Sequence, residues 1–71
     1  MMEKISITGD FIKLDSLLKY AALVASGGEA KRVVADGLVA VNGEVCLMRG
    51  KKIHPGDVVS FCGAELQVEK A

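Results

Sequence analysis

Basic side chains gather in the middle of the sequence, although the chain as a whole carries no net charge. Between Lys31 and His54 there are five cations against two anions, a local excess of +3. Ammonium groups and guanidinium forks at such spacing can follow a phosphate backbone without reading bases. Composition alone does not distinguish such an anion-binding surface from an ordinary solvated face. The choice depends on the elements that position these cations.

Residue types that catalysis or metal binding require are sparse in this sequence. His54 is the only histidine, and it stands beside Pro55 in a turn, which favours a solvated imidazole. A zinc site built from Cys46, Cys62 and His54 lacks a fourth ligand and the paired spacing of structural zinc sites. The sequence therefore predicts that the protein is not an enzyme and holds neither a metal nor a cofactor.

The segment Ser26-Gly27-Gly28-Glu29 admits two interpretations. Two glycines before a helix can cradle a phosphate with backbone amides, but no strand-GxxxxGK[ST] pattern surrounds them. Ser26 followed three residues later by Glu29 is typical of a capping box. The serine hydroxyl would accept from the Glu29 amide, and the glutamate would reach back to Ser26. We favour the capping turn.

The size and composition of the chain predict one domain over residues 1–71 with a small aliphatic core. Apolar residues make up 51% of the sequence, whereas aromatic residues make up only 4%. A chain of this length leaves few residues for the walls of a deep ligand pocket, which lowers the expectation of an enzyme further.

The N-terminal sequence and the two cysteines predict a cytoplasmic protein with two thiols. Residues 1–10 lack the long apolar segment of a secretory signal. No apolar run approaches the roughly 18 residues that a membrane span needs, so we expect no membrane partner.

Hydrophobic spacing predicts a strand followed by two short helices. Residues 4–8 alternate apolar and polar side chains, which is typical of a strand. From residue 13 to about residue 25 the spacing becomes helical, and a second helix is predicted over 27–36, ended by Gly37 in a positive-φ conformation. The apolar stripe of the first helix is Leu14, Leu17, Leu18, Ala21 and Ala22.

The second half of the chain predicts four short strands. Asn42-Gly43 between apolar runs favours a type I′ hairpin joining strands at 38–41 and 44–47. A basic loop at 48–52 and a turn at 54–57 precede strands at 58–61 and 64–69. The expected fold is α+β. Two short N-terminal helices form an αα-corner packed on a small, mostly antiparallel sheet of four to five short strands.

The stretch KLDSLLKYAALVASGGEAKRVVADGLVAVNGEV, together with the later KKIHPGDVV, resembles the RNA-binding domain first named for ribosomal small-subunit protein S4. The resemblance covers about residues 13–59, and the strands at 4–8 and 64–69 flank it. It implies an S4-like, or αL-motif, fold. Similar domains are appended to pseudouridine synthases and tyrosyl-tRNA synthetases, and they form the main body of a small ribosome-associated heat-shock protein.

The resemblance also implies which residues contact RNA. Lys13-Leu14-Asp15 stands where the family usually has Arg-Leu-Asp, and Glu29-Ala30-Lys31-Arg32 follows Ser26 in the second-helix motif. Many members have a basic residue directly after that serine, where this chain has Gly27-Gly28. The RNA-binding positions carried over by the resemblance are Lys13, Lys31, Arg32, Arg49, Lys51 and Lys52.

The function implied is a non-catalytic RNA-binding module that contacts structured ribosomal or transfer RNA through a basic face, in ribosome assembly or translation. Its partners would be RNA and the ribosome or another ribonucleoprotein. The alternative is a protein-interaction adaptor that uses the same face against an acidic partner. Both readings depend on the same electrostatics, so the sequence leaves the alternative open.

Overall fold

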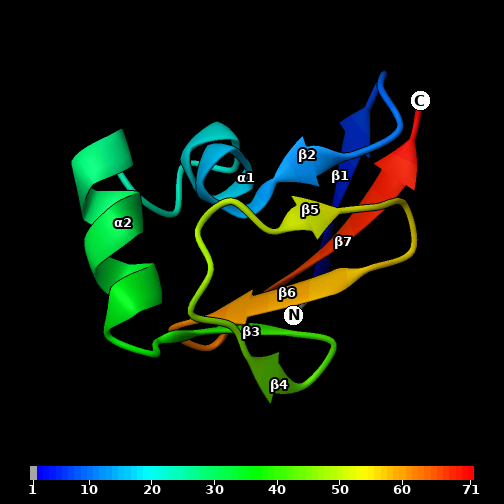
Figure 1. The fold of residues 1–71 in the computed structure, drawn as a ribbon. Helices are drawn as coiled ribbons and strands as arrows, with labels where there is room; N and C mark the ends of the chain where they lie inside the picture. The colour runs from blue at the N-terminus through cyan, green and yellow to red at the C-terminus, as the bar shows by residue number, and fades with distance from the viewer. Residues whose placement is uncertain (1) are drawn as a thin grey trace.

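Two helices and seven strands form the fold of residues 2–71, the part of the chain that this computed structural model describes (Figure 1). The elements are β1 (Met2–Ile7), β2 (Ile12–Lys13), α1 (Leu14–Tyr20), α2 (Gly27–Ala35), β3 (Val39–Val41), β4 (Glu44–Val45), β5 (Lys52–Ile53), β6 (Val58–Phe61) and β7 (Ala64–Lys70).

Five of the strands form one sheet in the order β1-β7-β6-β3-β4. The β1–β7 pair is parallel, and the other neighbours are antiparallel. This confirms the predicted α+β class with a mostly antiparallel sheet. The flanking strands differ slightly from the prediction, because β1 covers 2–7 instead of 4–8 and β7 extends one residue further, to Lys70.

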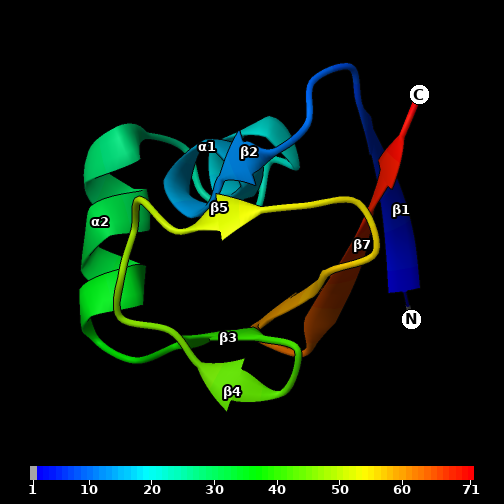
Figure 2. The same ribbon diagram turned by 45° about the vertical axis from the view of Figure 1, so that its right-hand side comes forward.

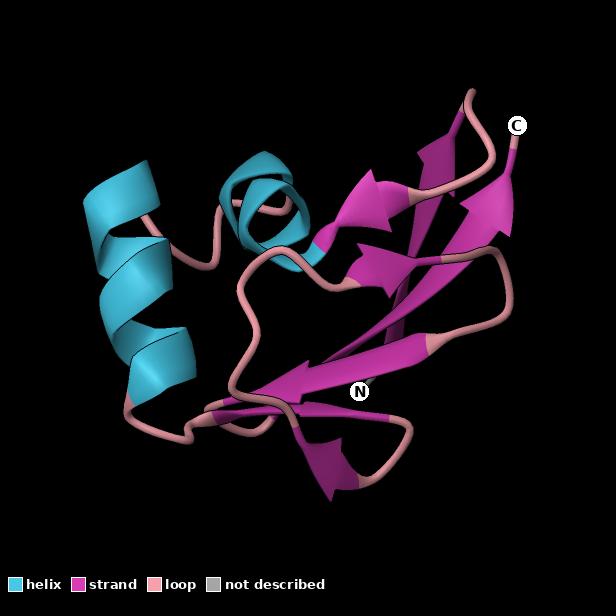
Figure 3. Ribbon diagram, viewed as in Figure 1, coloured by secondary structure: helices cyan, strands magenta, loops and turns pink. Residues whose placement is uncertain are grey.

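The core lies between the helices and one face of this sheet, as Figure 3 shows with the helices in cyan and the strands in magenta. Val41, Val59 and Leu66 are direct neighbours across β3, β6 and β7, so their side chains form one apolar row. The buried side chains are all aliphatic: Ile7, Leu14, Leu17, Leu18, Val24, Ala30, Val34, Val39, Val41, Ile53, Val59, Leu66 and Val68. The prediction of an aliphatic core is confirmed.

The first helix is shorter than predicted, because it ends at Tyr20 instead of near Ala25. Ala22 has φ of 59°, and its N–H donates to the Lys19 carbonyl at 3.0 Å. The N–H of Leu23 donates to the Leu18 carbonyl at 3.0 Å. These two bonds form a Schellman ending, which usually has glycine at the left-handed position. An alanine there gives no helix-stop signal in the sequence.

The second helix begins with the predicted serine cap. The Oγ of Ser26 accepts from the Glu29 N–H at 3.2 Å. The reciprocal bond is displaced by one residue, since the Glu29 Oε1 accepts from the N–H of Ala25 at 2.6 Å instead of from Ser26. The helix ends at Ala35, and Gly37 has the predicted positive φ, at 75°.

The turns that join the strands follow the predicted chemistry. Asn42 and Gly43 both have positive φ, 52° and 85°, as a type I′ hairpin requires. A second two-stranded sheet, formed by β2 and β5, was absent from the prediction. It places Lys13 at the end of a strand, directly before the first helix, and Lys52 in a strand instead of the loop.

Candidate functional site

The β2–β5 pair places two lysines face to face. Lys13 and Lys52 are direct partners in this antiparallel ladder, and both side chains are exposed. Like charges directly opposite each other on a sheet are destabilising. Lys13 is also the N-cap residue of α1, where the helix dipole disfavours a cation. Its position is therefore electrostatically unfavourable in two ways.

The loop before β5 is attached to the first turn of α1 by backbone hydrogen bonds. The N–H of Leu14 donates to the Lys51 carbonyl at 2.9 Å, and the N–H of Asp15 donates to the Arg49 carbonyl at 3.0 Å. These bonds satisfy helix N–H groups that have no partner within the helix. They also hold the loop cations beside Lys13. We call Lys13, Arg49, Lys51 and Lys52 the basic cluster.

The two cations of α2 lie on its outer side. Lys31 and Arg32 are exposed, whereas Ala30 and Val34 of the same helix are buried in the core. In both views of the ribbon the loop between β4 and β5 runs alongside α2 (Figures 1 and 2). The structure thus brings four of the six predicted residues together and leaves two on the neighbouring helix.

Few of the cations are neutralised by the protein's own carboxylates. Of the nine lysines and arginines, only Lys70 forms an ion pair within the described chain, with Asp10 at 3.6 Å. All six candidate side chains are exposed. They are therefore free to bind an external anion.

Aromatic side chains that the sequence analysis did not assign to the site lie next to the basic cluster. The Nζ of Lys52 lies 4.9 Å from the centre of the Phe11 ring, and the His54 ring lies 6.1 Å from it. Phe11 is 40% exposed and Tyr20 is 65% exposed. The chain has only three aromatic residues. The sequence signal that could have assigned Phe11 to the site was its position directly before Ile12-Lys13.

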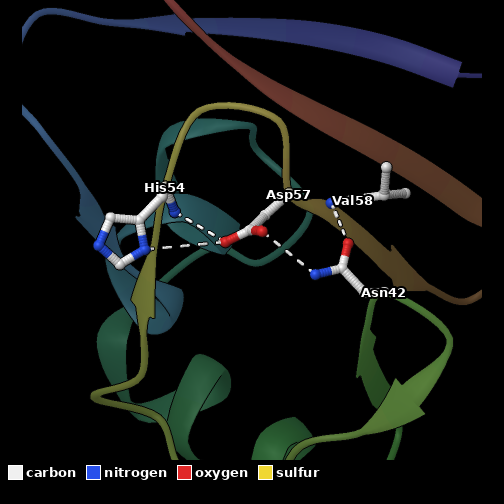
Figure 4. A network of polar contacts seen from close by, with 4 residues as sticks. All are labelled: Asn42, His54, Asp57 and Val58. Atoms are coloured by element: carbon white, nitrogen blue, oxygen red, sulfur yellow. Dashed lines mark hydrogen bonds and ion pairs between the residues drawn. The ribbon is translucent and has the colours of Figure 1, made fainter.

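A polar network fixes the turn that follows β5, as Figure 4 shows. One oxygen of Asp57 accepts from the His54 N–H at 2.9 Å, and the other accepts from the Asn42 side-chain amide at 3.1 Å. The Asn42 Oδ1 in turn accepts from the Val58 N–H at 2.9 Å. The network joins the β3–β4 turn to the turn between β5 and β6, and so holds β5 in place against β2.

The same contacts affect the acidity of Asp57. The hydrogen bond from the His54 N–H lowers the pKa of this carboxyl below its usual 3.8, although partial burial opposes the effect. The bond from Asn42 and the nearby His54 and Lys51 lower the pKa further. Asp57 is therefore held as a carboxylate, the form that accepts both hydrogen bonds.

The described part of the chain contains no cluster of potential metal ligands. Between residues 2 and 71, no group of three or more His, Cys, Asp or Glu side chains is arranged to hold a metal ion. Cys46 is half-buried and Cys62 is exposed, and both are free thiols. Neither α1 nor α2, the helices of this region, has the length and apolar character to cross a membrane.

Comparison with known proteins places the chain among small bacterial relatives. The family model of the S4 domain matches residues 5–69. The "Probable ribosome maturation protein RlbA" of Bacillus subtilis (strain 168) is 41% identical over 63 residues, which are 89% of each chain. YbcJ of Escherichia coli (strain K12) is 40% identical over 57 residues, 80% of this chain and 81% of YbcJ.

A solved structure shares the fold as well. The solution structure of YbcJ from E. coli, described as revealing an αL motif involved in RNA binding, superposes with a TM-score of 0.66 and 34% identity. The match covers 96% of this chain and 85% of that one. The two helices, the main sheet and the order in which they occur thus correspond to a known architecture.

Proposed function

This chain belongs to the S4 domain family, and from that premise we propose that it is a non-catalytic RNA-binding module. Residues 1–71 act as one S4-like unit that contacts structured ribosomal or transfer RNA. The contact runs through the basic cluster and the two cations of α2. The likeness to YbcJ, whose αL motif is described as involved in RNA binding, supports this assignment.

The position of Lys13 is the observation that carries the proposal. This residue lies opposite Lys52 in the small sheet and occupies the N-cap position at the positive end of α1, where its side chain makes no capping hydrogen bond. Each arrangement costs stability to the isolated protein. A bound phosphate relieves both repulsions, because an anion between the two ammonium groups is attracted to each of them.

The geometry favours recognition of shape and phosphate over base-reading by a helix. The first helix has seven residues, and its N-terminal N–H groups are already bonded to the loop carbonyls of Arg49 and Lys51. The cations belong to a strand pair, a loop and the outer side of α2, so they form an extended surface. Structured RNA is bound mostly through such phosphate and shape contacts.

For this chain we propose a role in ribosome assembly or translation in the bacterial cytoplasm. RlbA is named as a probable ribosome maturation protein, and the S4 domain model covers almost all of this chain. We extend the same class of substrate, structured ribosomal RNA, to this chain.

A salt titration tests the proposal. Fluorescence anisotropy measures binding to a labelled ribosomal RNA hairpin at increasing potassium chloride. If about five phosphates are neutralised, the slope of log K against log salt is about −3 to −4. The variant Lys13→Gln/Arg49→Gln/Lys51→Gln/Lys52→Gln loses most of this slope. An affinity that does not change with salt in the unmodified protein contradicts the proposal.

A second candidate is a protein-interaction adaptor, because exposed apolar side chains lie close to the basic loop. Leu38, Val45, Leu47 and Met48 are each between 52% and 68% exposed. Exposed apolar groups beside charged ones are typical of protein-binding surfaces. Affinity purification with and without ribonuclease separates the two functions, since an adaptor keeps its partner after RNA is digested.

A further inference from the structure

We propose that a hollow beside the basic cluster receives an unpaired nucleobase of the bound RNA, which stacks against Phe11 and Tyr20. The inference rests on the proposed RNA-binding function and adds a second kind of contact to it. Phosphate contacts alone do not select between paired and unpaired RNA. A base-sized site next to the phosphate contacts selects unpaired RNA, because only an unpaired base can enter it.

The hollow is open to solvent and has a volume of about 310 Å³. Its walls are residues 6–9 at the end of β1 and in the following turn, together with Phe11, Ile12 and Tyr20. Phe11 and Tyr20 are both exposed, whereas the third aromatic residue, Phe61, is half-buried. Two of the three rings thus border one surface depression.

The chemistry of the walls fits a nucleobase. Aromatic rings stack on the face of any base, and the backbone and hydroxyl groups at residues 6–9 offer polar partners for a base edge. The adjacent Asp10 carboxylate is paired with Lys70 at 3.6 Å, which reduces its repulsion of RNA at the rim.

The charges beside the hollow fit the rest of a nucleotide. Lys13 directly follows Ile12, a wall residue, and the Nζ of Lys52 lies 4.9 Å from the centre of the Phe11 ring. A base stacked on Phe11 therefore has the Lys52 ammonium within reach of a flanking phosphate. A base inside a duplex is stacked and paired, so it cannot enter. The occupant is an unpaired base from a loop or a bulge.

Tyr20 supplies a direct readout, because it is the only tyrosine and the chain has no tryptophan. The intrinsic fluorescence of the protein therefore reports this one ring. Two blunt-ended RNA duplexes without loops are titrated, identical except that one adenine is paired in the first and is left as a bulge in the second by removal of its uridine partner. We expect both to bind with salt dependence, the bulged RNA about tenfold more tightly and with quenching of Tyr20.

Matched variants test whether the rings of Phe11 and Tyr20 make the stacking contact. Tyr20→Ala and Phe11→Ala each lose most of this roughly tenfold preference for the bulged RNA if stacking is the interaction removed. Tyr20→Phe keeps the ring and keeps the preference. Circular dichroism checks that the folds are intact, and Leu47→Ala is a control for removal of an exposed apolar side chain outside the hollow.

The outcomes distinguish a failure of the nucleobase site from a failure of the proposed RNA-binding function. Equal affinity for the two RNAs with unchanged Tyr20 fluorescence overturns the nucleobase site but leaves RNA binding in place. Equal quenching by both RNAs overturns it too, since a sugar or phosphate would then lie against the ring. If neither RNA binds in a salt-dependent way, the proposed RNA-binding function is overturned instead.

Discussion

Lys13 and Lys52 are direct partners across the β2–β5 ladder, so two cationic residues stand opposite each other on the smallest sheet of the protein. The loop cations Arg49 and Lys51 are held next to them through backbone bonds to the start of α1. A folded chain without an anionic ligand gains nothing from this concentration of charge. The arrangement therefore predicts opposite effects of mutation on stability and on RNA binding.

Replacing Lys13 by glutamine is expected to stabilise the fold and weaken RNA binding. The change removes the repulsion from Lys52 and a cation from the N-terminus of α1, which together raise the unfolding free energy by about 0.2–1 kcal/mol. The slope of log K against log salt becomes shallower by about 1. Urea denaturation and anisotropy titrations measure the two quantities.

Lys4→Gln is the matched control, because Lys4 is an exposed cation on β1 outside the basic cluster. It should change neither the stability nor the salt slope appreciably. Parallel losses of stability and affinity in Lys13→Gln would show that Lys13 has a structural role instead.

The double variant Lys31→Ala/Arg32→Ala tests whether α2 shares the RNA contact. Both side chains are exposed, so the fold should remain intact, and alanine is at least as good a helix former. If both contact phosphates, the salt slope becomes shallower by about 1.5, at about 0.7 per phosphate. An unchanged slope would confine the RNA contact to the basic cluster.

Asp57→Asn is expected to destabilise the protein at neutral pH by about 1–3 kcal/mol, because an amide has one oxygen where the carboxylate accepts two hydrogen bonds. The folded-state pKa of Asp57 lies below 3.8. Its contribution is therefore fully present above the unfolded pKa, and it is lost as the pH falls through the folded pKa. The free energy of unfolding of Asp57→Asn should thus fall less between neutral and acidic pH than that of the parent protein.

Glu65→Gln is the control for that experiment, since Glu65 is an exposed carboxylate on β7 with no side-chain hydrogen bond in the described chain. It should leave the acid limb of the stability curve nearly unchanged. An Asp57→Asn curve that follows the parent protein at every pH would mean that the network adds no stability.

Ala22→Gly and Gly37→Ala form an opposed pair at the ends of the two helices. Both residues have positive φ, 59° and 75°. Glycine adopts this conformation freely, whereas alanine is strained by about 1 kcal/mol. Urea denaturation should show that Ala22→Gly stabilises the protein and Gly37→Ala destabilises it by similar amounts. A loss of stability in Ala22→Gly would contradict the left-handed ending of α1.

The parts of the fold that local chemistry determines were predictable from the sequence. The Asn42-Gly43 turn, the Ser26 cap and the alternation of β7 each depend on a few neighbouring residues. The short extent of α1 was not predictable, because alanine carries no stop signal at position 22. The β2–β5 sheet was missed because strands of two residues show no periodicity.

The candidate site was predictable as a set of residues but not as an arrangement. Local charge and family resemblance selected the six cations. The pairing of Lys13 with Lys52 depends on β5 returning to β2 across about forty residues, which no local pattern encodes. The contact of Lys52 with Phe11 depends on the same pairing. The sequence analysis therefore did not assign Phe11 to the site.

The parallel pairing of β1 with β7 joins the first strand of the fold to the last. During synthesis on a ribosome, β1 emerges early but has to wait for residues 64–70 before its ladder can form. Contacts of such long sequence separation slow folding, because the intervening chain must be ordered first. The backbone edge of β1 that pairs with β7 is therefore open to other chains until residues 64–70 have been synthesised and the ladder can form.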